Sequence, residues 1–103
     1  MLARLPLPAT ERWPEGVPFV EAFAHGGLEM ELFAPRGADH QTPHAQDELY
    51  IVIAGSATLT IDGVAHACTM GDALFVPARV LHRFTNISDD FATWAIFWGE
   101  AKT

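Results

Sequence analysis

Residues 57–69 read ATLTIDGVAHACT, and this stretch decides the fold. The dipeptide Asp62-Gly63 separates two apolar segments and tolerates the positive φ angles of a type I′ turn. Such a turn fixes the pairing of the strands on either side of it, so we predict a tight antiparallel hairpin. The predicted pairs are Ile61 with Val64 and Leu59 with His66. One face of the hairpin then carries Leu59, Ile61, Val64, His66 and Cys68.

Short segments with strand character lie on both sides of this hairpin. Between Gly27 and Pro35 apolar and polar residues alternate, which predicts a half-buried strand with leucines and methionine on one face and glutamates on the other. Segment 49–54 is a continuous apolar run rich in β-branched residues, so both of its faces should be covered. Further strands are expected at 57–61, 73–76, 80–86 and 91–98. No helical period extends over ten residues, so the sequence predicts an all-β barrel or sandwich.

The composition limits the number of domains and the kinds of partner. A chain of 103 residues has the length of one domain, and we divide it into a proline-rich N-terminal arm, 1–19, and a folded domain, 20–103. Asp and Glu number 13 against 6 Lys and Arg, a net charge of −7, which argues against nucleic-acid and anionic-membrane partners. The single cysteine, Cys68, cannot close an internal disulfide, and no stretch approaches a membrane span. We therefore expect a cytoplasmic protein.

The high apolar content predicts a partner subunit. Hydrophobic residues make up 50% of the chain, whereas a domain of this size buries only about two-thirds of its unfolded surface. The C-terminal segment 91–98 is apolar on both faces, so its outward face should be covered. We expect a homodimer.

A cluster of metal-ligating residue types precedes the buried strand at 49–54. It contains His40, His44, Asp47 and Glu48, and imidazole with carboxylate suits Fe, Mn, Zn, Ni or Cu. His44 and Glu48 are four residues apart, so they meet on one helical face but lie about 13 Å apart on a straight strand. Because the following β-rich run leaves space for only about one helical turn, the preferred interpretation is a bend between two strands, with His44 ending one strand and Glu48 opening the next. Asp47 should then point away from Glu48, as a solvated bend residue.

A further histidine lies on an apolar strand face near the C-terminal end. His82 shares its predicted face with Val80, Phe84 and Asn86. Taken alone, a histidine in this setting is more often a core residue than a metal ligand.

Two spacing patterns in these segments resemble the cupin family. In the first cupin motif a histidine, a glutamate and a glycine are separated by three or four and then six residues, as His44, Glu48 and Gly55 are here. The second motif is reproduced at the family spacing by Gly71, Pro77, His82 and Asn86. The resemblance covers about residues 20 to 98. It implies a double-stranded β-helix, a jelly-roll-like barrel of two antiparallel sheets with a ligand cavity between them.

The resemblance also implies a metal centre. Its ligands here would be His44, Glu48 and His82, a set similar to the triads of two histidines and one carboxylate that hold non-haem Fe(II). Thr42 stands where the family has another histidine, and Arg79 where it has a glycine. Gln41 and His40 are the candidates for a fourth ligand.

The implied function is a metal-dependent reaction on a small organic molecule. One divalent ion is expected, with Fe first and Zn, Ni, Mn or Cu as alternatives, and an Fe(II)-dependent dioxygenase reaction is the leading activity. Other readings are a non-catalytic small-molecule or metal-binding sensor module, or a metal-free isomerase or epimerase. Candidate pocket residues are Phe75, Phe84, Trp94 and His66. Cys68 is expected to be a buried small hydrophobe.

Overall fold

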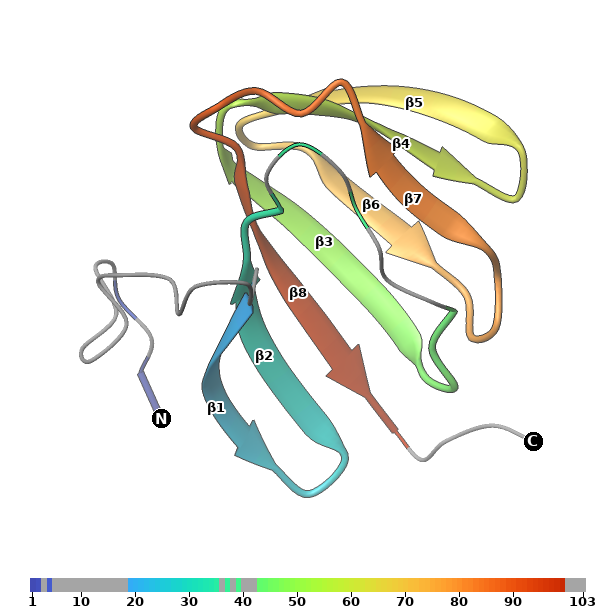
Figure 1. The fold of residues 1–103 in the computed structure, drawn as a ribbon. Coiled ribbons are helices and arrows are strands. Elements are labelled where there is room, and N and C mark those ends of the chain that lie inside the picture. Colours follow the sequence, from blue (N-terminus) through green and yellow to red (C-terminus); the bar gives the residue numbers. More distant parts are fainter. Residues whose placement is uncertain (3, 5–18, 36, 38, 40–42, 100–103) are drawn as a thin grey trace.

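The fold consists of two antiparallel β-sheets packed face to face. The computed structural model describes residues 1, 2, 4, 19–35, 37, 39 and 43–99, and this part of the chain contains eight strands and no helix. The strands are β1 (Phe19–His25), β2 (Leu28–Phe33), β3 (Asp47–Ala54), β4 (Ser56–Ile61), β5 (Val64–Thr69), β6 (Ala73–Val76), β7 (His82–Thr85) and β8 (Ala92–Trp98). One sheet has the order β1-β2-β8-β3-β6 and the other β5-β4-β7 (Figure 1). The predicted all-β double-stranded β-helix is confirmed.

Two further expectations concern the N-terminal arm and the lack of a membrane span. Most of the proposed proline-rich arm, 5–18, lies outside the described residues. In the described part, no helix is long and apolar enough to span a membrane.

The hairpin of β4 and β5 forms in the predicted register. Ile61 pairs with Val64 and Leu59 with His66. The turn residues Asp62 and Gly63 have φ angles of 48° and 84°, in the left-handed region that this turn needs. The turn chemistry therefore determines which side chains of both strands face the other sheet.

Gly55 carries the chain from one sheet to the other. It follows β3, has a φ of 70°, and ends the apolar run at the predicted residue. A Cβ atom at this position would overlap the Oγ of Ser88 and would lie 2.7 Å from the Cα of Phe91. Only glycine fits the crossing between β3 and β4.

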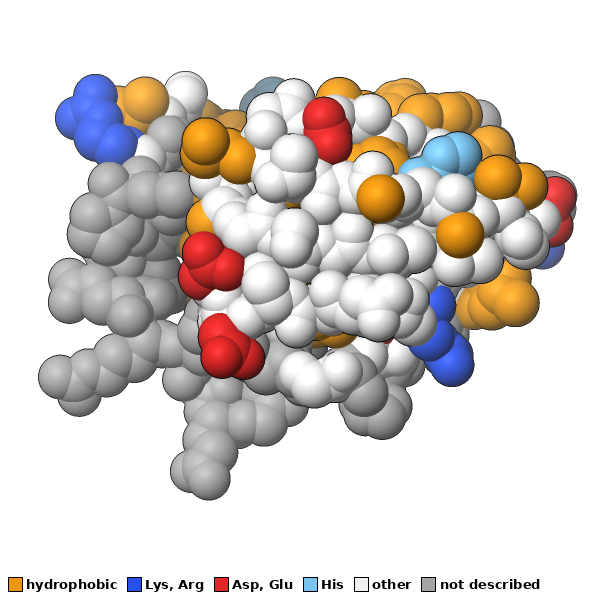
Figure 2. Space-filling view, turned by 90° about the horizontal axis from the view of Figure 1, so that it is seen from above, with side chains coloured by type: hydrophobic (Ala, Val, Ile, Leu, Met, Phe, Trp, Pro, Cys, Tyr) orange, Lys and Arg blue, Asp and Glu red, His pale blue; other side chains and the backbone are white. Residues whose placement is uncertain are grey.

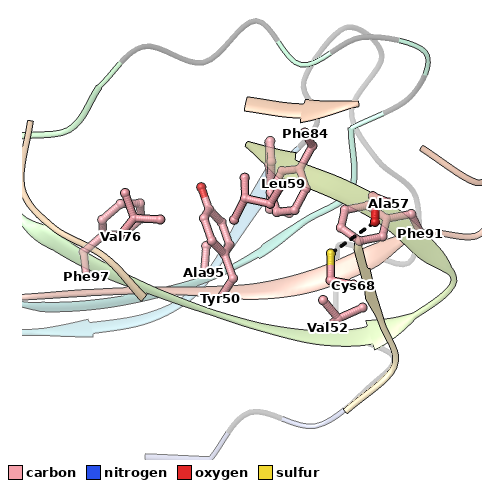
Figure 3. Close-up of a cluster of buried hydrophobic side chains, with 11 residues drawn as sticks. Tyr50, Val52, Ala57, Leu59, Cys68, Val76, Phe84, Phe91, Ala95 and Phe97 are labelled. Carbon is pink, nitrogen blue, oxygen red and sulfur yellow. Dashed lines mark hydrogen bonds between the residues drawn. The ribbon is translucent and has the colours of Figure 1, made fainter. Parts of the chain in front are cut away.

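The core lies between the sheets and is rich in aromatic side chains. Figure 3 shows Tyr50 of β3 and Phe84 of β7 reaching towards each other from opposite sheets, with ring centroids 4.9 Å apart in an edge-to-face contact. Phe91 packs on Phe84 at 5.0 Å, and Cys68 is buried beside Ala57, whose carbonyl accepts the Sγ–H hydrogen bond at 3.4 Å. The expected role of Cys68 as a buried small hydrophobe agrees with this placement.

The glutamates of β2 lie on the inner face of the larger sheet. The residues of β2 alternate as predicted, but Glu31 pairs with Ala95 and Glu29 with Phe97. Ala95 and Phe97 are core residues, so both glutamates share the face that looks towards the smaller sheet. The leucines and the methionine of β2 lie on the outer face.

Two strands differ from their predicted extent. β1 was not predicted, because a β-bulge between Glu21 and Phe23 interrupts its alternation. β7 begins at His82 rather than at residue 80, because Arg79 adopts a positive φ of 68° and the carbonyl of Leu81 accepts a hydrogen bond from the N–H of Asp62. Its first residue is thereby the histidine of the second motif.

The outer face of the smaller sheet is formed by short and polar side chains. Figure 2 looks down on this sheet, and its surface there is mostly backbone and uncharged polar atoms. Thr58, Thr60 and Ala65 lie on this face, opposite to Leu59. The apolar content of the fold is concentrated in the core and on the outer face of the larger sheet.

Candidate metal centre

Three potential ligands from three parts of the chain meet between the sheets. Glu48 is the second residue of β3, and it pairs with Phe97 of β8 and Val76 of β6 on the inner face. His82 is the first residue of β7 and pairs with Ile61, which places its ring opposite Glu48. His44 lies in the loop before β3.

The donor atoms are close enough to share one ion. His82 Nε2 lies 3.2 Å from Glu48 Oε1, and His44 Nε2 lies 3.8 Å from the same oxygen. One ligand atom of each residue lies within 4.8 Å of those of the other two. Adjacent ligands of an ion with bonds of about 2.1 Å are about 3.0–3.5 Å apart, so small side-chain adjustments would bring all three onto one cation.

The carbonyl of Val80 selects the tautomer of His82. It lies 2.9 Å from Nδ1 of the ring and accepts the proton of that nitrogen. In the neutral ring Nε2 is then unprotonated and directs its lone pair at the Glu48 carboxylate, which is also a lone-pair donor. Two lone-pair donors facing each other at 3.2 Å are the arrangement that a cation between them would stabilise.

The polar atoms at the centre of the cluster have no hydrogen-bond partner. Glu48 and His82 are each 1% exposed, and Glu48 Oε1, Glu48 Oε2 and His82 Nε2 are all buried and unsatisfied. An ionised carboxylate buried in this way costs several kcal/mol unless a positive charge compensates for it. The donor set, two imidazoles and one carboxylate, suits a divalent transition metal, so the residues present fit such an ion.

The local electrostatics favour positive charge at His82. Burial lowers the pKa of the imidazole, but Glu48, the Val80 carbonyl and Asp39 raise it more in sum, so that the pKa lies above its ordinary value. The same negative surroundings would attract a metal cation.

The bend before β3 forms, but His44 does not end a strand. Residues 45–46 are bent and β3 starts at Asp47, whereas the described residues between β2 and residue 46 have no strand geometry. The side-chain amide of Gln46 donates to the carbonyl of Gly99 at 2.6 Å and to that of Gly27 at 3.1 Å. These bonds fix the bend, and the His44 ring packs edge-on against Phe97 at 4.8 Å.

Two aspartates near the cluster accept hydrogen bonds from backbone N–H groups. Asp47 points away from Glu48 as predicted, but it is not merely solvated, because its Oδ1 accepts a hydrogen bond from the N–H of Ala78 at 2.9 Å. Asp39 is buried, and its Oδ2 accepts the N–H of Phe84 at 2.9 Å. Sequence reasoning missed Asp39, because a lone aspartate in a loop gives no signal of its burial.

The proposed pocket residues separate into three places. Phe84 lies in the core, in contact with Tyr50, whose ring is 6.0 Å from that of His82. Trp94 pairs with Leu32 and Ile51 on the outer face of the larger sheet, away from the triad, so it is not a wall of this site. The two fourth-ligand candidates, His40 and Gln41, lie outside the described residues.

The other two candidates, Phe75 and His66, line a separate open groove between β5 and β6. The groove has a volume of about 450 Å³. Its lining residues are Ile61, Val64, His66, Ala73, Leu74 and Phe75. The structure therefore does not bring Phe75 and His66 to the triad.

The comparisons with known proteins agree with this architecture. Residues 29–98 match the family described as "Cupin domain". An uncharacterized protein of Streptomyces coelicolor is 41% identical over 59 residues, which are 57% of this chain and 56% of that protein. The chain thus matches little more than half of the length of this curated relative.

Two solved structures show the same fold. A cupin superfamily protein from Desulfitobacterium hafniense has a TM-score of 0.69 at 20% identity, covering 80% of this chain and 76% of that one. The DMSP lyase DddQ from Ruegeria pomeroyi has a TM-score of 0.71 at 21% identity, covering 82% of this chain and 48% of that one. With the family match over most of the folded part, these findings show that the chain belongs to the cupin family.

Proposed function

We propose that this cupin holds one divalent transition-metal ion with His44, Glu48 and His82, and that it acts on a small organic substrate in an Fe(II)-dependent reaction with dioxygen. The observation that carries the proposal is the set of three buried, unsatisfied donor atoms of Glu48 and His82 next to His44. A triad of two histidines and one carboxylate leaves open positions on Fe(II). The bound ion would supply Lewis acidity and redox reactivity towards dioxygen.

The protein residues divide the remaining tasks. Glu48 and His82 are almost fully buried, whereas the His44 side chain is 33% exposed, so a substrate would approach from the side of His44. Val80 orients the His82 ring through Nδ1, and Phe97 packs against His44. The aromatic core around Tyr50 and Phe84 closes the site behind His82 and limits the access of water.

Elemental analysis of protein purified without an affinity tag tests the metal directly. Stoichiometric Fe supports the proposal, whereas Zn or Ni supports a metal centre of another kind. An empty site that also fails to bind added Fe(II) contradicts the proposal.

Oxygen uptake tests the reaction. Fe(II)-loaded protein should consume dioxygen with a compound of the catechol, thiol or diketone class, because such compounds can occupy the open positions beside dioxygen. If no compound elicits uptake but one binds tightly in calorimetry, the protein is a binding module and not an oxygenase.

A fourth ligand would come from the segment just before His44. His40→Ala and Gln41→Ala separate the two candidates, because loss of a ligand lowers the affinity for the metal and loss of a bystander does not. If both variants bind the metal as tightly as the wild type does, neither residue is a ligand, and the site consists of His44, Glu48 and His82.

A further inference from the structure

β5 is an edge strand that lacks the features by which edges are usually protected. In the described part of the chain the two sheets end in β1, β6, β5 and β7 (Figure 1). β1 contains a β-bulge, β6 has four residues and is followed by Pro77, and β7 has four residues and carries Arg83. β5 has six residues, pairs with β4 without a register shift, and contains neither a charged residue nor a proline. Such an edge is a template on which another strand can pair.

The alternation of hydrogen bonds shows which backbone groups of β5 reach its outer edge. The N–H of Asp62, directly after β4, donates to the carbonyl of Leu81 on the side of β7. Backbone groups of successive strand residues point to opposite sides, so Ile61 bonds towards β5, to its pair Val64. The same alternation along β5 directs the backbone groups of three residues to the outer edge: Ala65, Ala67 and Thr69.

One of these three residues already has a partner. Asp72 Oδ2 accepts the N–H of Thr69 at 2.8 Å, and the N–H of Asp72 donates to the carbonyl of Thr69 at 3.0 Å. Ala65 and Ala67 are exposed, and no described strand lies on their side of β5. Each of them offers one N–H donor and one C=O acceptor, so donors and acceptors are present on this edge in equal number.

These groups are complementary to the same groups of a second copy. In an antiparallel pair centred on His66, Ala65 lies opposite the partner's Ala67, and Ala67 lies opposite the partner's Ala65. Each opposite pair exchanges both of its N–H···O=C bonds, so every group that Thr69 does not account for is bonded. A pairing centred on Ala67 would instead place Ala65 opposite Thr69, whose groups are already bonded. One centred on Ala65 would place Ala67 opposite the turn residue Gly63.

The charge and the side chains at this edge also suit a second copy. Each copy carries a net charge of −7, so two copies repel each other least along an edge without charged residues. The groove of about 450 Å³ between β5 and β6 runs along the inner side of the edge, where Val64 is 58% and Phe75 is 50% exposed. A strand that continues the smaller sheet brings its own Val64 and His66 to the open side of this groove. Pairing therefore removes apolar surface from water.

We propose that the outer edge of β5 binds the same edge of a second copy, in an antiparallel pairing centred on His66 that joins the two smaller sheets into one. This inference does not depend on the metal site. The edge is separate from the outward face of β8, which the sequence predicts to be covered. One molecule can use both contacts, and their combination joins four copies.

Disulfide trapping tests the register. In the proposed pairing the two copies of residue 66 form a non-hydrogen-bonded pair with Cα atoms about 4.5 Å apart, within the range of a disulfide. In a Cys68→Ala background, which removes the native thiol, His66→Cys should form a covalent dimer on mild oxidation. Val64→Cys in the same background is the matched control, because Val64 lies on the same face of β5 but no second thiol lies opposite it. It should give at least about tenfold less cross-linked dimer.

A proline distinguishes strand pairing from chance collision. The N–H of Ala67 points to the outer edge, so Ala67→Pro leaves the bonds between β4 and β5 in place and removes one donor from each copy. Added to the His66→Cys variant, this change should abolish the cross-link. Ala67→Ser keeps the N–H and should preserve the cross-link.

Hydrogen exchange tests the unaltered protein, and it decides alone if a variant does not fold. The amides of Ala65 and Ala67 should exchange more slowly as the protein concentration rises, because their bonds form only between copies. The amide of Thr69 is bonded to Asp72 within one copy, so its exchange should not depend on concentration. The proposal is wrong if exchange at Ala65 and Ala67 is independent of concentration. Equal cross-linking of His66→Cys and Val64→Cys, or a cross-link that survives Ala67→Pro, would also overturn it.

Discussion

The backbone N–H of Arg79 donates a hydrogen bond to the carbonyl oxygen of His44 at 2.6 Å. Arg79 lies in the turn before β7, and it can present its N–H in this direction because its φ is 68°. The left-handed conformation disfavours side chains, and the cupin motif has a glycine at this position. Arg79 thus adopts a conformation that glycine takes easily, while carrying a side chain.

The same turn contacts the chain at each of the three proposed ligands. Besides the bond from Arg79, the N–H of Ala78 donates to Asp47, the residue before Glu48, and the carbonyl of Val80 orients His82. The segment 77–80 therefore connects two parts of the chain that are nearly forty residues apart in sequence. Its hydrogen bonds hold the ligands in place before a metal binds.

Asp47→Ala should lower metal affinity by about 10- to 100-fold, because it frees the turn from the start of β3. The matched control is Asp72→Ala, which removes a similar hydrogen bond, from Thr69 N–H to Oδ2 at 2.8 Å, in the turn after β5. Each variant should lose about 1 kcal/mol of unfolding free energy, but only the first should lose affinity in a competitive chelator titration. Equal metal affinities of the two variants would show that the turn does not position the ligands.

Removal of the metal should destabilise the protein strongly. The three ligands come together only in the folded state, so an ion held by all three stabilises that state by about 4.1 kcal/mol at a free concentration of about 1,000 times its dissociation constant. For a domain of about 100 residues each kcal/mol shifts Tm by about 4–8 °C. Chelation should therefore lower Tm by more than about 10 °C. Differential scanning calorimetry with and without chelator measures this change.

Variants assign this stabilisation to the triad. His82→Ala should abolish most of the metal-dependent shift in Tm, because two ligands cannot complete the set, whereas Cys68→Ala should keep the shift. An unchanged Tm of fully loaded wild-type protein after chelation would mean that the triad does not bind metal.

Glu31→Gln should stabilise the metal-free protein at alkaline pH. The pKa of Glu31 is raised to about 7 by burial and by its glutamate neighbours, so the folded state binds more protons than the unfolded state between about pH 4.5 and 7. Stability contributed by the protonated form is lost as the pH rises through this window. The variant should gain about 1 kcal/mol, or about 4–8 °C in Tm, at about pH 8.5 after allowance for solvent screening of this half-buried group.

At about pH 4 the same variant should match the wild type, because the wild-type carboxyl is then protonated in both states. Glu29→Gln, at an exposed position, should show a smaller gain at alkaline pH. A Tm difference for Glu31→Gln that does not change with pH would contradict the assigned environment of Glu31.

The parts of the fold that follow from local chemistry could be predicted from the sequence. The register of β4 and β5 depends on the Asp62-Gly63 turn, and the turn acts within a few residues. The convergence of His44, Glu48 and His82 could not be derived from spacing alone; it came from the resemblance to the cupin motifs. The bend was predicted because a straight strand cannot bring His44 to Glu48.

The parts that depend on distant contacts could not be predicted. The alternation in β2 separates the glutamates from the apolar residues, but it does not show which of the two faces looks inward. In the structure the glutamates face inward and the apolar residues face outward. The burial of Asp39 depends on an N–H of β7 that is 45 residues away. The location of Trp94 follows from the register of β8 with β2 and β3, which the sequence pattern leaves open.

The outer face of the larger sheet leads us to propose a homodimer. Ile96 pairs with Met30 and Leu49, and Trp94 pairs with Leu32 and Ile51, so apolar side chains continue across three neighbouring strands. At one end of this face Trp98, 37% exposed, lies against Phe75, 50% exposed, with ring centroids 6.0 Å apart. Two copies that each carry a net charge of −7 repel each other, so an uncharged apolar surface is the part of the molecule on which they can associate.

Trp98→Asp should therefore weaken the dimer. We expect an interface of about 1,600 Å² or more, and a buried carboxylate near its edge should shift the mass in light scattering towards the monomer at micromolar concentration. Met70→Asp is the matched control, because Met70 is 69% exposed in the turn after β5, away from this face. Trp98 lies on the opposite face from Glu48, so metal content should stay unchanged in both variants. A monomeric wild type, or equal masses of the wild type and Trp98→Asp, would place the interface elsewhere or exclude it.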